Sequence, residues 1–229
     1  MSGVRGPGEP APSAAATGTG TRTGAVPADR PEAWRVEGSE VAYRGAKTAT
    51  RVDRVHMPGP DGDEVVAREY LDHPGAVAAL ALDDHERVLM LSQYRHPVGH
   101  RLWELPAGVR DEEGEPPLAT AQRELREEAG FAAGDWYELA DFFPSPGFSS
   151  ERIQVFLGRG PTRLNADEIG FERVHEETDM ELRWVPLAEA AEAVMAGRLH
   201  NGATVVGVLA ASRAARDSFA SLRPAGTGS

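Results

Sequence analysis

The stretch that decides the fold is AGVRDEEGEPPLATAQRELREEAGF, which runs from Ala107 to Phe131. It begins with a glycine-bearing loop and continues into a segment with three glutamates within five residues, Glu124, Glu127 and Glu128. The two prolines before this segment suit the first positions of a helix, where a missing amide hydrogen costs nothing. Gly130 suits the left-handed cap that ends a helix. We therefore predict a helix from about Pro117 to Ala129.

The spacing of this predicted helix separates an apolar face from an acidic one. At about 100° per residue the apolar side chains share one face, Leu118, Ala121, Leu125 and Ala129. The three glutamates fall together on another face, where like charges repel one another. A hard divalent cation relieves this repulsion and prefers carboxylate oxygens, and Arg123 is placed to orient Glu127. The alternative interpretation of such a charge run is a solvated acidic helix face.

The same stretch resembles the Nudix box, which has a glycine, a glutamate and then R-E-apolar-x-E-E-x-G-apolar. The matching residues are Arg123, Glu124, Leu125, Glu127, Glu128, Gly130 and Phe131. There is one departure from the pattern, because six residues separate Gly108 from Glu115 where the usual pattern has five. The loop before the helix is thus one residue longer, or the glycine match is shifted, while the helical part is intact.

Three further strings extend the resemblance beyond the box: LWELPAG from Leu102, PGFSSE from Pro146 and HEETDM from His175. Together they look like the ADP-ribose pyrophosphatase branch of the Nudix hydrolases, particularly its actinobacterial members. The resemblance covers roughly residues 39–212. It implies hydrolysis of ADP-ribose to AMP and ribose 5-phosphate, with Mg²⁺ or Mn²⁺ as the cofactor. It also implies a homodimer in which the N-terminal sheet of one subunit covers the other.

The resemblance also implies roles for individual residues. The metal ligands would be the Ala107 carbonyl, Glu124, Glu127 and Glu128. The catalytic candidates are Glu176, which matches the family's loop glutamate best, with Glu177 as the near alternative and Glu127 from the box. Arg95 and Glu104 match polar positions of the substrate cleft, and Arg68 is a candidate for a nucleotide or phosphate contact. Trp34 and Tyr43 are candidates for stacking on adenine, although either suits a core equally well.

The composition narrows the class of protein. The chain has 229 residues and a formal net charge of −12, which argues against nucleic acid as a main partner. No apolar run approaches the ~18–20 residues of a membrane-spanning helix, so we expect no membrane partner. The chain has no cysteine, which excludes disulfides and thiolate metal sites and is compatible with the reducing cytoplasm, where we expect the protein.

Composition and patterning also predict the organisation of the chain. Residues 1–30 are rich in Gly, Ala, Pro and Thr and are expected to form a disordered tail. Residues 31–72 read as a small antiparallel sheet for dimerisation or as a substrate lid, because short strands flank the turn at residues 58–63. Residues 73–219 are expected to form the Nudix domain and residues 220–229 a frayed end. The fold class is α/β, an α/β/α sandwich with mixed sheets.

Within the larger domain, apolar runs at residues 76–82 and 87–94 predict a hairpin, and residues 136–143, 152–158 and 180–185 predict further strands. Residues 161–178 read as a long, polar, acidic loop. Helices are predicted over residues 186–196 and 202–218. The second of these has a predicted apolar side, formed by Val205, Val206, Val208, Leu209 and Ser212.

Two other functions remain open from the sequence. The box recognises only a diphosphate and a metal, so the substrate could be another nucleoside diphosphate linked to a second group, such as a nucleotide sugar or a dinucleotide. The other alternative is a non-catalytic sensor that binds ADP-ribose-like ligands and regulates a partner. Such a sensor could lose its metal-binding carboxylates, whereas this chain keeps all three.

Overall fold

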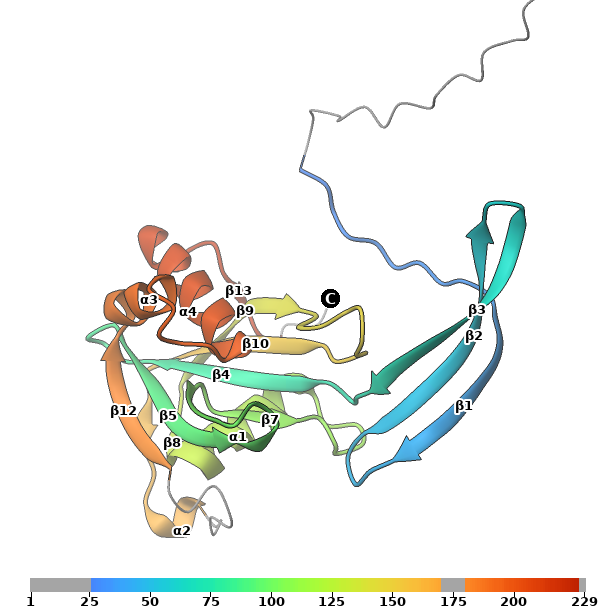
Figure 1. Cartoon of the computed structure of the whole chain (residues 1–229). Coiled ribbons are helices and arrows are strands. Elements are labelled where there is room, and N and C mark those ends of the chain that lie inside the picture. The colour runs from blue at the N-terminus through green and yellow to red at the C-terminus, as the bar shows by residue number, and fades with distance from the viewer. Residues whose placement is uncertain (1–25, 170–179, 227–229) are drawn as a thin grey trace, which may run out of the picture. The chain divides into compact units, whose positions relative to one another are not determined.

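The computed structural model describes residues 26–169 and 180–226, and its described residues from Trp34 onward belong to one compact unit (Figure 1). An antiparallel three-stranded sheet comes first, with β1 (Val36–Arg44), β2 (Ala49–Gly59) and β3 (Gly62–Asp72) in that order. The turn predicted around residues 58–63 joins β2 to β3, with Gly59 opposite Gly62. The small N-terminal antiparallel sheet expected from the sequence is therefore confirmed.

A mixed sheet of eight strands forms the centre of the larger part. Its order is β12-β5-β4-β10-β9-β13, while β6 pairs with β5 and β7 pairs with β4. The bounds are β4 (Ala76–Leu82), β5 (Arg87–Arg95), β6 (His100–Glu104), β7 (Ala107–Val109), β9 (Asp135–Phe142), β10 (Ile153–Arg159), β12 (Glu181–Pro186) and β13 (Arg223–Pro224). β4 and β10 are parallel, and the other pairs are antiparallel. The apolar run of β4 is buried on both faces, as expected of a covered central strand.

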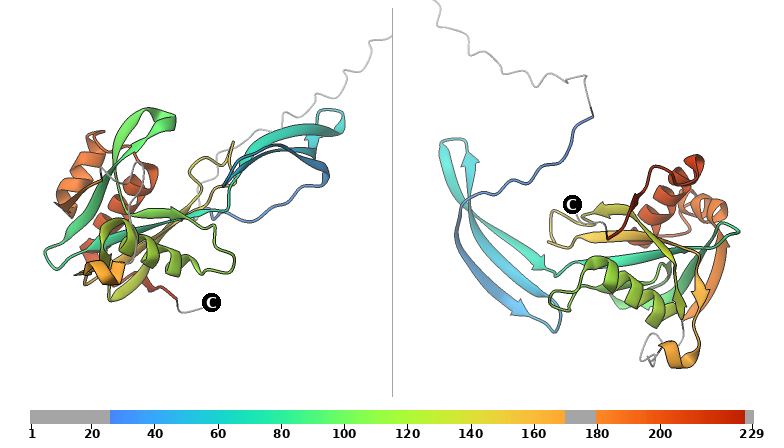
Figure 2. Two further views of the ribbon diagram at one scale, coloured as in Figure 1. Left: turned by 90° about the horizontal axis from the view of Figure 1, so that it is seen from below. Right: turned by 180° about the vertical axis from the view of Figure 1, so that it is seen from behind.

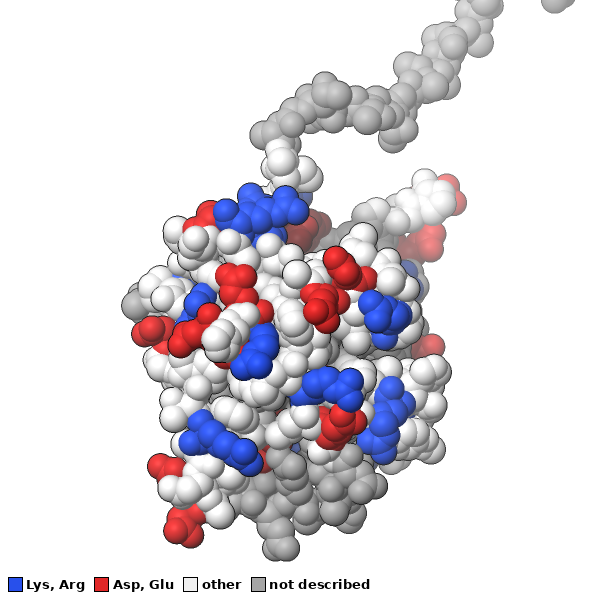
Figure 3. All heavy atoms as spheres, turned by 90° about the vertical axis from the view of Figure 1, so that its left-hand side faces the viewer, with Lys and Arg blue, Asp and Glu red and all other residues white. Residues whose placement is uncertain are grey.

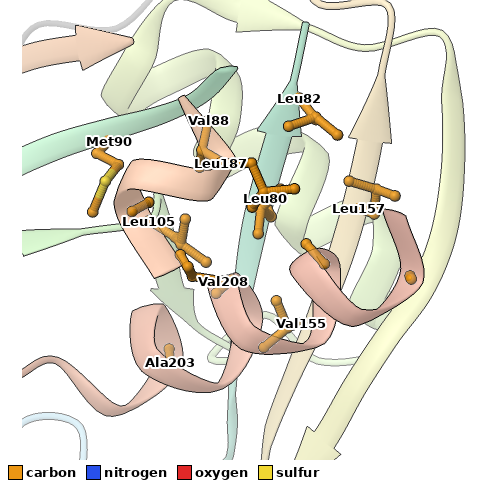
Figure 4. Close-up of a cluster of buried hydrophobic side chains, with 14 of the residues drawn as sticks. Leu80, Leu82, Val88, Met90, Leu105, Val155, Leu157, Leu187, Ala203 and Val208 are labelled. Carbon is orange, nitrogen blue, oxygen red and sulfur yellow. The ribbon is translucent and has the colours of Figure 1, made fainter. Parts of the chain in front are cut away.

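Helices cover both faces of this sheet, which confirms the α/β/α expectation (Figure 2). On one face α1 (Pro117–Ala129) packs through Ala121 and Leu125 against Val77 and Leu89. On the other face lie α3 (Leu187–Met195) and α4 (Gly202–Ala214), and their apolar side chains join a cluster with the opposite side of β4 (Figure 4). Because side chains alternate along a strand, β4 supplies a separate core to each layer.

The helix predicted from the central stretch is confirmed at both ends. α1 begins at Pro117 and ends at Ala129, and Gly130 has the left-handed conformation, with a φ of 71°. The amide of Gly130 donates to the carbonyl of Arg126 at 2.9 Å, which satisfies one of the last carbonyls of the helix. Of its predicted core-facing side chains, Ala121, Leu125 and Ala129 are buried and Leu118 is partly buried.

The apolar side predicted for the last helix is right only in part, because Val208 is buried but Leu209 is exposed. α4 buries mainly small residues, Ala203, Thr204, Gly207, Val208, Ala211 and Ala214, whereas Leu209 is exposed. The reason is close packing on the sheet: a Cβ at Gly207 would lie 2.9 Å from Leu105 Cδ1. A face of small residues lets the helix approach the sheet, and Val208 is the one predicted valine among the buried residues of α4.

Several short elements also differ from the expectation. Residues from 220 onward were expected to be frayed, but Arg223 and Pro224 form β13 and pair with Glu138 and Tyr137 of β9. The loop expected over residues 161–178 contains β11 (Thr162–Arg163), which pairs with β8 (Phe131–Ala132), and α2 (Ala166–Ile169). The hairpin of β4 and β5 is joined through a single residue pair, Leu82 with Val88. Short 3-10 turns occur at η1 (His96–Val98) and η3 (Ala215–Asp217).

Two further features concern the surface charge and the length of the helices. On the face shown in Figure 3, basic and acidic side chains are interspersed and no patch of a single sign forms. Among the described residues, no helix has both the length and the apolar character needed to cross a membrane.

Candidate active site

The site is built where α1 passes the short strand β7. The backbone of Gly108 lies directly against the carboxylate of Glu124, and a Cβ at this position would overlap that carboxylate. β7 is fixed in turn by its pairing with β4, which places Gly108 opposite Val77. The glycine of the box is therefore required by the close approach of the backbone to the helix. This contact supports the match at Gly108 rather than a shifted glycine.

Arg123 is the centre of a network of carboxylates. Its Nη1 donates to Glu124 Oε1 at 2.8 Å and to Glu127 Oε2 at 3.3 Å. Its Nη2 donates to Glu115 Oε2 at 3.1 Å. The guanidinium thus joins two glutamates of α1 to the loop before the helix. Such an arrangement reduces the repulsion between the helix glutamates and fixes their orientation.

Glu115 anchors the longer loop to the helix. Besides Arg123, it accepts a hydrogen bond from Thr120 Oγ1 at 2.9 Å, within the second turn of α1. Farther back in the loop, Asp111 pairs with Lys47 Nζ at 2.9 Å. The additional residue therefore does not displace the glutamate of the box, which still reaches the arginine. Sequence matching indicated Glu115 but gave no role for it, because its contacts depend on how the loop folds back.

Glu128 is oriented by the backbone. This residue is 7% exposed, and its Oε2 accepts a hydrogen bond from the amide of Ala107 at 2.8 Å. Ala107 is thereby held beside the acidic side of α1, which is where the sequence places it as a carbonyl ligand. The structure thus brings together all four predicted metal-site residues, Ala107, Glu124, Glu127 and Glu128.

The charges of the cluster affect one another's protonation. Burial raises the pKa of Glu124 above its ordinary value, and the nearby Arg123 opposes this only in part. The hydrogen bond from Arg123 lowers the pKa of Glu115, and the same bond raises the pKa of Arg123. A buried carboxylate with a raised pKa is a group that gains from an additional positive charge beside it.

The donor atoms of this cluster are of the kind that bind a divalent cation. Its ligands are carboxylate oxygens and a backbone carbonyl, which suit Mg²⁺ or Mn²⁺, and the backbone at Gly108 leaves space that a side chain would fill. In the described part of the chain, no three carboxylate or imidazole groups converge on one point. Arg123 and the Ala107 amide bind these oxygens instead. The types of ligand present suit a divalent cation. To bind one, the carboxylates that now contact Arg123 would have to turn toward the ion.

A second cluster lies on the hairpin of β5 and β6. Arg95 and Glu104 form a bidentate ion pair, with Nη2 to Oε2 at 2.6 Å and Nε to Oε1 at 3.0 Å. The Glu104 side chain is 2% exposed, whereas that of Arg95 is 41% exposed. The two predicted cleft residues therefore contact each other, with the carboxylate buried and the arginine side chain partly exposed.

The remaining predicted residues lie elsewhere. Arg68 lines a hollow of about 320 Å³ with Tyr70 and with residues 146–150, and its Nη1 donates to the carbonyl of Ala67. Trp34 and Tyr43 are exposed, at 44% and 68%, so neither is a core residue of this chain. Glu176 and Glu177 lie outside the described residues, and their assignment stays a prediction.

This fold and this acidic helix define a nucleotide hydrolase of one known family. The model of the NUDIX domain matches residues 72–203, and the chain belongs to this family. Among curated proteins, it is 46% identical over 189 residues to an ADP-ribose pyrophosphatase of Mycobacterium tuberculosis, which covers 82% of this chain and 87% of the relative.

Two further comparisons give the range of the family. A methanol dehydrogenase activator of Bacillus methanolicus is 32% identical over 170 residues, which cover 74% of this chain and 88% of the relative. A solved structure described as an ADP compounds hydrolase matches with a TM-score of 0.64 at 17% identity, over 83% of this chain and 98% of the other. At that identity the structural match supports the fold alone.

Proposed function

We propose that this protein hydrolyses the diphosphate of ADP-ribose to AMP and ribose 5-phosphate, with Mg²⁺ or Mn²⁺ as cofactor. The observation that carries the proposal is the intact cluster of Glu124, Glu127 and Glu128, oriented by Arg123 and the Ala107 amide. The similarity to the M. tuberculosis pyrophosphatase, which extends over most of both chains, supports the choice of substrate.

Each residue of the site has a role in this proposal. Glu124, Glu127, Glu128 and the Ala107 carbonyl would hold the metal. When bound, a divalent ion neutralises the diphosphate and lowers the pKa of the attacking water. Arg123 orients the ligands and keeps them together before the ion arrives. Arg95, whose side chain is partly exposed, contacts the phosphates while the buried Glu104 holds it in place.

The proton acceptor for the attacking water is proposed from the sequence alone. Glu176 is our first candidate and Glu177 the second, with Glu127 of the box as a further possibility. Arg68 is proposed to reach the nucleotide or a phosphate, since it lines the hollow beside residues 146–150. Trp34 and Tyr43 remain candidates for adenine stacking, because both expose aromatic surface.

A substrate panel tests the function. The full-length protein is incubated with ADP-ribose and Mg²⁺, and AMP is measured by chromatography beside nucleotide sugars and dinucleotides. We expect AMP from ADP-ribose at the highest kcat/KM of the panel and none after the metal is chelated. Rapid turnover of another diphosphate without AMP from ADP-ribose would reassign the substrate. Binding of ADP-ribose without hydrolysis in the presence of Mg²⁺ or of Mn²⁺ would favour the function of a non-catalytic sensor.

We also propose a homodimer in which residues 31–72 cover the partner. The three-stranded sheet exposes apolar side chains that a second subunit would bury, Val36, Val41, Tyr43 and Val65. Light scattering on the purified protein measures the mass in solution. We expect twice the chain mass for the wild type and a shift toward monomer for Val41→Asp. A wild-type protein that is monomeric at micromolar concentration would contradict this arrangement.

A further inference from the structure

Gln93 is a buried polar residue with an unsatisfied atom. It lies on β5, it is 5% exposed, and its Oε1 has no hydrogen-bond partner. A buried acceptor without a partner costs about 1–3 kcal/mol. In native proteins such an atom calls for an explanation, and a ligand that supplies the missing donor is one.

The register of the hairpin places Gln93 beside Arg95 and Glu104, the two predicted cleft residues. Because side chains alternate along β5, Gln93 shares a face with Leu89 and Arg95. Leu89 belongs to the core cluster beneath α1, so this is the face that carries the glutamates. The amide of Gln93 is therefore directed to the same side of the sheet as the proposed metal site.

The ion pair of the hairpin crosses the position of Gln93. In the β5–β6 ladder Gln93 is opposite Leu102, between the pair formed by Arg95 with His100 and the pair formed by Leu91 with Glu104. Arg95 nevertheless binds Glu104, so its side chain must run back along the strand past Gln93. The Gln93 side chain therefore lies along the path of the Arg95 side chain, although its Oε1 receives no hydrogen bond.

The chemistry of this oxygen selects its ligand. An ionised diphosphate presents only acceptors, so it cannot satisfy an amide oxygen, whereas a sugar hydroxyl can donate to it. We propose that Gln93 is a specificity-determining residue whose Oε1 accepts a hydrogen bond from a hydroxyl of the sugar attached to the diphosphate. This inference rests on the proposed function and deepens it, since it assigns the recognition of the sugar to one residue beside Arg95.

The energetic consequence is discrimination between substrates. A site built to bind a substrate hydroxyl rejects an analogue that lacks it, because the buried polar group is then left unpaired. An interaction with the sugar changes kcat/KM only for substrates that carry the hydroxyl. If Gln93 contributed only to folding, its replacement would change kcat/KM for both kinds of substrate equally.

The test compares two substrates with the full-length protein and its metal. One is ADP-ribose, and the other is the ethyl ester of ADP, which keeps the adenosine and the diphosphate but has no sugar hydroxyl on the far side. We expect Gln93→Met to lower kcat/KM for ADP-ribose by about tenfold and for the ethyl ester by less than about twofold. The thermal midpoint should be unchanged or higher, since the unpaired acceptor is removed.

A matched control and a second variant keep the outcome decisive. Gln154→Met, on β10 and beside a different hollow lined by Arg223, should leave the ratio of the two kcat/KM values unchanged. If Gln93→Met does not fold, Gln93→Asn keeps the amide but withdraws it by one carbon, and it should lower kcat/KM for ADP-ribose more than for the ethyl ester. An equal loss on both substrates, or no loss on either, would overturn the proposal. If the wild type prefers another nucleotide sugar, the proposed function fails. The role of Gln93 is then tested by the ratio of kcat/KM for that nucleotide sugar to kcat/KM for the ethyl ester of the same nucleoside diphosphate.

Discussion

Two arginine–carboxylate clusters differ in which partner is buried. Arg123 is 19% exposed and lies among carboxylates from α1 and from the loop before it. Arg95 is 41% exposed and binds a carboxylate that is almost completely buried. In the first cluster the guanidinium is enclosed by acidic groups, whereas in the second the acidic group is enclosed and the arginine side chain is partly exposed.

Under the proposed function, this difference would give each cluster a separate task. The Arg123 cluster has an excess of negative charge, so a divalent cation can enter it and the arginine can keep its remaining contacts. In the Arg95–Glu104 pair, the buried carboxylate of Glu104 holds the partly exposed side chain of Arg95 in place. This arrangement suits an anionic substrate. We infer that the helix holds the metal and that the hairpin holds the diphosphate.

The largest effect is expected from the helix glutamates. Replacing Glu127 or Glu128 by Gln removes a proposed ligand charge at nearly constant volume, and we expect kcat to fall by at least about 100-fold. Steady-state kinetics with ADP-ribose and a titration of Mn²⁺ measure the effect. Gln122→Ala, an exposed position of the same helix, is the matched control and should retain activity. Full activity in both glutamate variants would remove the metal assignment.

The next effect concerns the arginine that orients these glutamates. Arg123→Met removes the guanidinium contacts of Glu115, Glu124 and Glu127, although Thr120 still donates to Glu115. We expect activity or metal affinity to fall by about 10–100-fold, as for other groups that orient ligands. Electron paramagnetic resonance of bound Mn²⁺ measures the affinity directly. Arg123→Lys keeps the charge without the planar fork and should recover only part of the loss. Recovery of full affinity by lysine would show that charge alone is sufficient.

A smaller and different effect is expected at the hairpin. Arg95→Met should raise KM for ADP-ribose by about tenfold, since one charge-assisted contact is lost, and should change kcat much less. Glu104→Gln should act in the same direction, because it frees Arg95 from its anchor. The double variant should be little worse than Arg95→Met, since both changes remove one coupled interaction. Additive losses would show that Glu104 acts independently of Arg95.

The two clusters also show what the sequence could predict. The helix from Pro117 to Ala129, its Gly130 cap and the common face of its glutamates follow from spacing within one element, and all were predicted. The pairing of Arg95 with Glu104 depends on the register of β5 with β6, which spacing along the chain does not determine. The close approach of Gly108 to the Glu124 carboxylate likewise depends on the pairing of β7 with β4.

The only partly correct face predicted for α4 has a related cause. Large apolar side chains usually mark the buried side of a helix, and the valines and Leu209 pointed in that direction. The sheet instead accepts the side with Gly207 and the alanines, because Leu105 and Val155 fill the space in front of that glycine. This complementarity depends on the surfaces of both α4 and the sheet, so the sequence pattern of α4 alone does not predict it.

The smallest effect is expected far from both clusters, in the turn between β4 and β5. Burial alone would raise the pKa of Asp83, but hydrogen bonds from Arg87 and from the backbone amide of His85 outweigh it, and the pKa lies below its ordinary value of 3.8. A carboxylate with a depressed pKa stabilises the folded state above the unfolded pKa, and this contribution is lost as the pH falls through the folded pKa.

Asp83→Asn should therefore lower the free energy of unfolding at pH 7 by about 1 kcal/mol and leave kcat and KM for ADP-ribose unchanged. Its deficit in thermal midpoint should shrink as the pH is lowered below about 3.8, because the wild-type carboxylate is then protonated as well. Asp84→Asn, the exposed neighbour, is the control and should shift neither quantity. A loss of activity in Asp83→Asn would contradict the separation of this turn from the two clusters, whereas a deficit independent of pH would show that the turn depends on shape rather than charge.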